Sequence, residues 1–332
     1  MPLLEINNLR VSFNAGRGRQ ARAVRNVSLE VERGESVGLV GESGCGKSTL
    51  AAAVMRLVQA ESGRIFYAGQ NVLGLRGRAL FDFRKKMQIV FQDPYGSLNA
   101  RLSVGAAIRE CLDVHGIGLR AEREGMVIDL LRTVGLDAMH AGRYPHEFSG
   151  GQRQRIGIAR ALAVNPEFII ADEPVSALDV SIQAQILNLL KDLQEKKRFS
   201  FLFIAHDLAV VRYMCARLYV MYMGEIMESG ATENVYAHPA HPYTRALLEA
   251  VPDVDRALRK RRALPSVPSI QNPNSKIRNI TETSSLSTAV SGCPFHPRCP
   301  MAKAICVENA PEIKKAADGR ACRCHFSGDS FS

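Results

Sequence analysis

The residues best suited to chemistry form a glycine-rich loop near the start of the chain. Gly41-Glu42-Ser43-Gly44-Cys45-Gly46-Lys47-Ser48-Thr49 matches the phosphate-binding pattern G-x-x-x-x-G-K-[ST] at every fixed position. Glycines let the backbone curl so that amide N–H groups face negative charge. Lys47 is expected to reach the β- and γ-phosphates, and the Ser48 hydroxyl to ligate Mg²⁺. The sequence therefore predicts a nucleotide site built from Gly41, Ser43, Gly44, Cys45, Gly46, Lys47, Ser48 and Thr49, with Cys45 as a small filler rather than a redox sensor.

Two carboxylates follow an apolar run further along the chain. Residues 168–171, Phe-Ile-Ile-Ala, predict a buried strand, and Asp172 and Glu173 come directly after it. Asp172 is expected to hold Mg²⁺ or its water, and Glu173 to point toward the γ-phosphate as a general base. A base in that role contributes roughly 10²–10⁴ in rate. The alternative is an Asp-Glu-Pro turn that caps the next helix.

Together with the stretch between them, these motifs resemble the ATPase cassette of ABC transporters. Residues 148–155, FSGGQRQR, are similar to the signature sequence of that family. The resemblance implies an α/β fold: a P-loop cassette with a RecA-like parallel sheet core, an antiparallel β subdomain and a helical subdomain. It also implies a composite site, in which Ser149, Gly150, Gly151 and Gln152 act in trans on ATP held by the opposite protomer.

The same resemblance implies roles for four more residues. Gln92, within VFQDP, matches the Q-loop glutamine that senses Mg²⁺ and the attacking water, and Asp179, within SALD, matches the D-loop. His206 matches the switch histidine, although a lone histidine that ends an apolar strand is usually a structural residue. Phe13 stands where the family places an aromatic ring against adenine. We therefore expect Lys47, Gln92, Glu173 and His206 to carry out hydrolysis, with Phe13 and Asp172 joining the loop in binding ATP and Mg²⁺.

Three further stretches are similar to the importer ATPases for dipeptides and oligopeptides. They are residues 91–99, FQDPYGSLN; residues 177–181, ALDVS; and residues 241–247, HPYTRAL, and the likeness covers roughly residues 3 to 255. It implies two transmembrane permease subunits, a second related ATPase subunit in a heterodimer or a homodimer, and an extracytoplasmic solute-binding protein that acts indirectly. Importers of nickel, glutathione and some sugars belong to the same branch, so the transported solute stays open.

Five of the eight cysteines lie between Cys293 and Cys324. Clustered thiolates in a reducing compartment suit an iron–sulfur cluster or zinc, although the paired C-x-x-C knuckles usual for structural zinc are missing. The segment resembles a tail of the peptide-importer branch that carries a [4Fe–4S] cluster in relatives. That resemblance implies Cys293, Cys299, Cys306 and Cys324 as ligands, with Cys322 as the alternative fourth; zinc and free thiols remain alternatives.

Alternating apolar and polar residues over 4–40, with a break at residues 16–19, predict antiparallel strands that lead into a buried strand at Val37–Val40. A helix is expected over 48–58, a helical subdomain over about 94–155, and alternating strands and helices beyond it, which indicates a parallel α/β core. The expected domains are a cassette over 1–255, a polar linker over 256–291 and a Cys-rich tail over 292–326.

Composition limits the class of protein. With 332 residues, of which 46% are hydrophobic, the chain can bury a sizeable core. We expect no secretory signal and no membrane-spanning segment, which needs about 20 apolar residues, and so predict a peripheral protein at the cytoplasmic face of the membrane. The net charge of +10 is dispersed. Alternatives are a soluble ABC ATPase without a transport role and a zinc-stapled nucleic-acid binder, but the tail offers only Phe295 and Phe326 for stacking, so no nucleic acid is expected.

Overall fold

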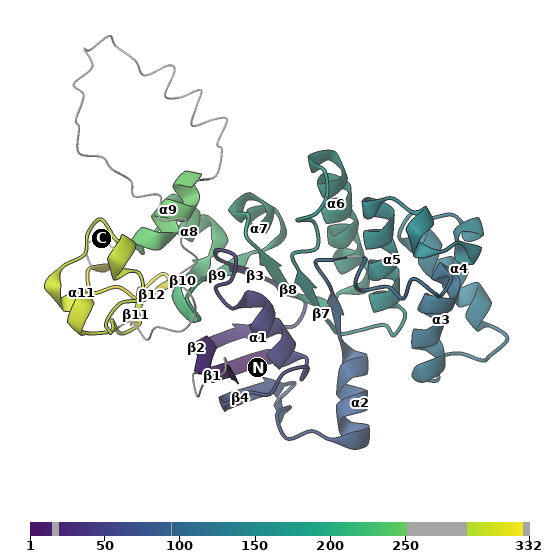
Figure 1. Cartoon of the computed structure of the whole chain (residues 1–332), viewed down its shortest axis with the longest axis horizontal. Helices are drawn as coiled ribbons and strands as arrows, with labels where there is room; N and C mark the ends of the chain where they lie inside the picture. The colour runs from purple at the N-terminus through teal and green to yellow at the C-terminus, as the bar shows by residue number, and fades with distance from the viewer. Residues whose placement is uncertain (15–19, 94, 251–290, 328–332) are drawn as a thin grey trace, which may run out of the picture.

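One continuous β-sheet organises the computed structural model, which describes residues 1–14, 20–93, 95–250 and 291–327 (Figure 1). The strands pair in the order β5-β4-β1-β2-β10-β9-β3-β8-β7-β6, with β12 joined to β10 and β11 to β12. Their bounds are β1 Leu4–Asn14, β2 Gln20–Val31, β3 Ser36–Val40, β4 Ser62–Tyr67, β5 Gln70–Asn71, β6 Met87–Val90, β7 Phe168–Asp172, β8 Ser200–Ala205, β9 Arg217–Tyr222, β10 Glu225–Ala231, β11 Lys314–Lys315 and β12 Ala321–Cys322.

The predicted parallel core is confirmed. β6, β7, β8, β3 and β9 lie side by side and pair in parallel. Every residue of β3, β7 and β8 is buried, as expected of strands covered on both faces. The loops that follow β3, β6, β7 and β8 therefore leave the same edge of the sheet, and this edge carries the candidate site.

The antiparallel strands near the N-terminus are also confirmed. β1 pairs antiparallel with β2, from Leu4 opposite Val31 to Asn14 opposite Gln20, and β4 pairs with the other side of β1. Inward residues of β1 such as Leu4, Ile6 and Leu9 are fully buried, which explains the alternation in the sequence. The predicted break at residues 16–19 lies outside the described residues.

The helices cover the sheet and form a group at one end of it. They are α1 Lys47–Val54, α2 Gly77–Lys86, α3 Val104–Val114, α4 Arg123–Thr133, α5 Gly150–Leu162, α6 Val180–Lys197, α7 Leu208–Met214, α8 Thr232–Ala237, α9 Pro242–Ala250 and α11 Ala304–Glu308, with short 3₁₀ helices at Ala138–Gly142, Pro145–Glu147 and His296–Arg298. In Figure 1, α3, α4 and α5 lie at the end of the molecule opposite the yellow C-terminal segment. None of the helices in the described residues combines the length and apolar character that crossing a bilayer demands.

The helix predicted over 48–58 ends earlier, at Val54. Arg56 adopts a left-handed backbone with φ 57°, and the N–H of Leu57 donates to the carbonyl of Ala52 at 2.8 Å. A left-handed residue with this backward hydrogen bond is a Schellman-type helix end. The Ala- and Leu-rich composition alone did not indicate the stop, since arginine is uncommon in that conformation.

The helical segment extends beyond its predicted end near residue 155. Ser149 caps α5, which then continues to Leu162. Buried residues of α3 and α4, among them Ile108, Leu112 and Leu131, belong to the same hydrophobic cluster as sheet residues such as Phe201. The helices and the sheet thus share one core, which sets the position of α5 relative to the parallel strands.

The cysteine-rich segment packs on the cassette. β12 pairs antiparallel with β10, with Cys322 opposite Glu228 and Ala321 opposite Ser229. Phe295 is buried in the main hydrophobic cluster. The expected linker over 256–291 lies outside the described residues except for Ser291.

Candidate active site

Glycines 41 and 46 give the phosphate loop its shape. Gly46 precedes α1 with φ 108°, a left-handed conformation that glycine tolerates best. A Cβ atom at Gly46 would collide with the carbonyl oxygen of Ala23, and one at Gly41 with that of Met221. The loop therefore lies so close to β2 and β9 that only glycine fits at these two positions. Strand β3, the loop and α1 follow one another as predicted.

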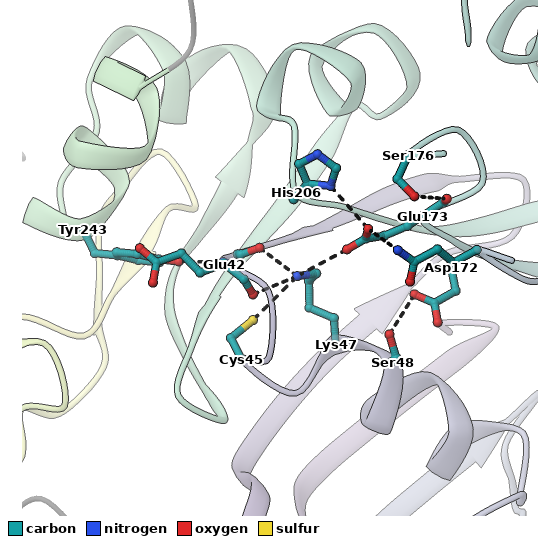
Figure 2. Close-up of polar contacts among 11 residues, drawn as sticks. Glu42, Cys45, Lys47, Ser48, Asp172, Glu173, Ser176, His206 and Tyr243 are labelled. Atoms are coloured by element: carbon teal, nitrogen blue, oxygen red, sulfur yellow. Dashed lines mark hydrogen bonds and ion pairs between the residues drawn. The ribbon is translucent and has the colours of Figure 1, made fainter. Parts of the chain in front are cut away.

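Lys47 is buried and lies across this loop. Its Nζ donates to the carbonyl oxygens of Gly41 at 2.7 Å and Glu42 at 3.0 Å, and lies 3.7 Å from Oε1 of Glu173 (Figure 2). The Ser48 hydroxyl donates to Oδ1 of Asp172 at 3.1 Å. These contacts join the phosphate loop to the end of β7.

Glu173 is the centre of the polar contacts in Figure 2. Its Oε2 accepts from Nε2 of Gln92 at 3.2 Å and lies 3.3 Å from Nδ1 of His206. The Glu173 side chain is only 13% exposed, while that of His206 is 56% exposed. Three residues thus converge on the Glu173 carboxylate, which follows β7: Lys47, Gln92 and His206, which follow β3, β6 and β8.

The backbone of Glu173 is itself unusual. It has φ 45°, a conformation that side-chain-bearing residues adopt rarely and at a cost of about 1–3 kcal/mol. Its N–H donates to the carbonyl of Ile204 at 2.9 Å, and the Ser176 hydroxyl donates to the Glu173 carbonyl at 3.1 Å. The adjacent strand and the following loop therefore hold the turn that aims this carboxylate at Lys47.

Burial affects the acid–base character of two neighbours. It raises the pKa of Asp172, and the nearby carboxylate of Glu173 raises it further, while the hydrogen bond from Ser48 and the charge of Lys47 oppose the shift. A divalent cation would favour the charged form of this carboxylate. Burial also raises the pKa of the Cys45 thiol, although Lys47 opposes this.

The residues expected to act in trans contact other parts of the same chain. Ser149 forms a capping box with Gln152, its hydroxyl accepting from the Gln152 N–H at 3.3 Å. A Cβ atom at Gly151 would collide with Ile182 at the start of α6, and one at Gly150 would lie 3.2 Å from Leu178. Within the part of the chain that the structure describes, Ser149 hydrogen-bonds to Gln152 and to no residue of the phosphate loop. Asp179 directly precedes α6, and Phe13 is 42% exposed on β1.

The four cysteines predicted as ligands line one pocket. Cys293, Cys299, Cys306 and Cys324 all border it, together with Phe295 and Phe326. Burial raises the pKa of the Cys293 thiol, and the nearby sulfurs of the other three raise it further. Cys322 does not line this pocket; it lies in β12 and is 1% exposed. Among the described residues, no group of three or more His, Cys, Asp or Glu is arranged to hold one metal ion.

Two residues that contact the phosphate loop were missed at the sequence level. The hydroxyl of Tyr243 accepts from the N–H of Glu42 at 2.9 Å, and the Arg298 guanidinium forms two hydrogen bonds with the Glu42 carboxylate. Tyr243 lies within the stretch similar to peptide-importer ATPases, and Arg298 lies between two cysteines. Neither position carried a local signal for contact with the loop.

Comparison with known proteins is consistent with this geometry. The family described as "ABC transporter" matches residues 24–176, and the family "Oligopeptide/dipeptide transporter, C-terminal region" matches residues 227–306. The "Putative oligopeptide transport ATP-binding protein YkfD" of Bacillus subtilis is 46% identical over 327 residues, which cover 98% of this chain and 96% of the relative. The chain belongs to the ABC ATPases of the oligopeptide transporter family. The predicted family and its ATPase activity are thereby confirmed, and membership implies ATP and Mg²⁺.

Further relatives agree with the assignment to the oligopeptide transporter ATPases. The "Oligopeptide transport ATP-binding protein OppF" of Streptococcus mutans is 53% identical over 261 residues, covering 78% of this chain and 85% of the relative. A solved dimeric structure of the ATP-binding cassette MJ0796, in a post-hydrolysis state bound to ADP and Pi, superposes with a TM-score of 0.63 at 29% identity, covering 69% of this chain and 98% of that one. CbiO1 from Clostridium perfringens, with a TM-score of 0.63 at 24% identity over 78% of this chain and 99% of that one, shares the fold.

Proposed function

We propose that this ABC ATPase hydrolyses ATP to energise the import of dipeptides or oligopeptides across the cytoplasmic membrane. The observation that carries the proposal is the convergence of Lys47, Gln92 and His206 on the Glu173 carboxylate, beside the Ser48–Asp172 pair. The set holds a cation for phosphate, two oxygen donors for Mg²⁺ and a carboxylate that can accept a proton.

Each residue has a distinct proposed role. Lys47 binds the β- and γ-phosphates, exchanging its contacts with the loop carbonyls and Glu173 for phosphate oxygens. Ser48 and Asp172 offer oxygen ligands 3.1 Å apart, which fits a hard cation such as Mg²⁺. Bound Mg²⁺ neutralises charge on the phosphates. Glu173 accepts the proton of the attacking water, while Gln92 and His206 fix the position of its carboxylate.

The remaining site residues are proposed to act between protomers. Ser149, Gly150, Gly151 and Gln152 lie at the start of α5, and the N-terminus of a helix suits an anion. We propose that they close over ATP on a second, related ATPase subunit, and that Asp179 crosses the same interface. Phe13 is exposed on β1 and is proposed to stack on adenine.

Peptide is the proposed solute class because the relatives named above are oligopeptide transport proteins. Their names favour peptides over nickel, glutathione or another small solute. We propose two transmembrane permeases as direct partners and an extracytoplasmic solute-binding protein as an indirect one. The chain then works as a peripheral subunit at the cytoplasmic face, in a heterodimer or a homodimer.

We propose that the cassette over 1–255, with its helical subdomain over about 94–155, is followed by the polar linker over 256–291 and a tail over 292–326 that binds a [4Fe–4S] cluster. The four lining cysteines fit this group, because each thiolate of a cluster binds a different iron and the sulfurs need not meet at one ion. Zinc would require four donors about 2.3 Å from a single ion. The position of Cys322 outside the pocket supports Cys324 as the fourth ligand.

Purification of the tagged chain from detergent-solubilised membranes tests the transport proposal. We expect permease subunits to co-purify, and the complex in liposomes to take up labelled oligopeptide with ATP but not with ADP. A chain that hydrolyses ATP yet brings down no membrane protein would instead support the soluble ATPase alternative.

Anaerobic purification tests the tail: about four irons and four sulfides per chain are expected, and about one zinc would contradict the cluster.

A further inference from the structure

The cysteine-rich tail reaches the phosphate loop through Arg298. Its guanidinium nitrogens donate to the two carboxylate oxygens of Glu42 at 2.7 and 2.8 Å, across 256 residues of sequence. Two parallel hydrogen bonds between arginine and a carboxylate hold both groups in a defined orientation. Glu42 follows Gly41 in the loop, and its carbonyl oxygen accepts from Lys47. The tail therefore contacts the loop one residue away from its first glycine.

Tyr243 holds the backbone of the same residue. Its hydroxyl accepts from the Glu42 N–H at 2.9 Å (Figure 2). The Tyr243 side chain is fully buried. The start of α9, which carries Tyr243, is itself anchored: the buried carboxylate of Glu228 accepts from the N–H groups of Ala240 and His241, both at 2.8 Å. Glu42 is thus held at its side chain by Arg298 and at its backbone by Tyr243.

An aromatic cluster ties these two contacts together. The ring of Phe295 lies 5.4 Å from the rings of Tyr222 and Tyr243, which are 4.6 Å from each other. The Arg298 guanidinium lies 5.8 Å from the Tyr222 ring and 5.9 Å from the Phe295 ring. Because Phe295 and Arg298 lie between Cys293 and Cys299, the conformation of this cysteine loop determines where the guanidinium points.

We propose that Arg298 and Tyr243 are positioning residues of the nucleotide site, through which the cysteine-rich tail controls the affinity for ATP. An unpaired Glu42 carboxylate would repel the phosphates bound by the same loop, and Arg298 cancels that charge while fixing the loop. The inference rests on the proposed function, in which this loop binds ATP and the cysteines hold a cluster. Loss of the cluster would release the 293–299 loop and, with it, the Arg298–Glu42 contact.

A double-mutant cycle on the full-length, anaerobically purified chain tests this coupling. Arg298→Gln is expected to weaken Mg-ATP binding about two- to fivefold, the range of a partly exposed ion pair, with kcat at saturating ATP nearly unchanged. In a Glu42→Gln background the same substitution should have almost no effect, since the repelling charge is gone. Tyr243→Phe keeps the ring but loses the acceptor, and should also weaken binding with little change in kcat.

Lys303→Gln is the matched control. The Lys303 ammonium lies 4.4 Å from the Phe326 ring. The substitution therefore removes a cation of the tail that contacts this ring rather than Glu42. ATP affinity should stay at the wild-type value. If Arg298→Gln proves unstable, Arg298→Lys replaces it in the test. Lysine keeps the positive charge but cannot form the two parallel hydrogen bonds to Glu42, so the ATP affinity should lie between those of wild type and Arg298→Gln.

Removal of the metal gives an independent readout. Iron-depleted wild type should bind ATP as weakly as Arg298→Gln, and reloading with iron and sulfide should restore wild type but leave the variant unchanged. Equal effects of Arg298→Gln in both Glu42 backgrounds, or no effect in either, would overturn the inference even in an iron-loaded protein. A chain without iron that still shows the Arg298–Glu42 coupling would retain the positioning role and refute only the proposed cluster.

Discussion

Glu173→Gln is the sharpest perturbation of the site, because it removes one charge and almost no volume. Glu173 Oε2 is shared by Gln92 and His206, and Oε1 lies 3.7 Å from Lys47. The glutamine keeps one acceptor oxygen, so one of the Oε2 contacts can persist. The side chain is 13% exposed, and its left-handed backbone is held by Ile204, which the substitution leaves in place. We therefore expect the fold to survive.

The catalytic effect should far exceed the structural one. A positioned general base contributes roughly 10²–10⁴ in rate, which corresponds to about 3–5 kcal/mol of transition-state stabilisation. ATP binding should be unchanged or tighter, because a carboxylate no longer faces the γ-phosphate and Lys47 no longer interacts with an anion on that side. The variant should thus separate binding from hydrolysis.

Steady-state phosphate release and equilibrium binding of a fluorescent ATP analogue measure the two quantities on the same preparation. Glu195→Gln, which removes an exposed glutamate from α6, is the matched control and should hydrolyse ATP like the wild type. Turnover by Glu173→Gln within threefold of wild type would refute the general-base role. A parallel loss of ATP binding would show instead that Glu173 mainly holds the site together.

Three further predictions address the tail, the signature segment and pH. Cys324→Ser should lose iron, whereas Cys322→Ala should keep it, because Cys322 lies outside the shared pocket; iron and sulfide content per chain decides between them. Ser149→Ala removes the cap on the Gln152 N–H, so thermal unfolding should show a loss of about 1 kcal/mol, while ATPase turnover should fall about 10²-fold if Ser149 donates to phosphate in trans. Burial lowers the pKa of His115 below its ordinary 6.5, so the unfolded chain binds the proton more readily than the folded one. Stability therefore falls as the pH drops through 6.5. His115→Gln should reduce the change in Tm between pH 7 and pH 5, and an unaltered pH dependence would contradict the lowered pKa of His115.

Local patterns predicted the parallel core well, and with it the sheet edge that carries the candidate site. Buried strands read as continuous apolar runs, and the loops that follow them carry Lys47, Gln92, Glu173 and His206, so parallel pairing alone brings these residues to one edge. Helix ends were less predictable. α1 stops at Val54 because Arg56 turns left-handed, and α5 continues to Leu162 because its apolar face packs into the shared core.

The amino-acid sequence by itself determined the nucleotide chemistry. The phosphate loop and the carboxylate pair at the end of a strand are each formed by residues that lie close together in the sequence, so both can be recognised without the fold. Only the tertiary structure decided how the tail relates to that site. The Arg298–Glu42 contact closes over 256 residues, and Tyr243 meets Glu42 through the packing of α9, so neither has a local signature. The pairing of β12 with β10 likewise places Cys322 opposite Glu228 and outside the cysteine pocket, which Cys324 lines. The spacing of the cysteines alone did not distinguish Cys322 from Cys324 as the fourth cysteine of that pocket.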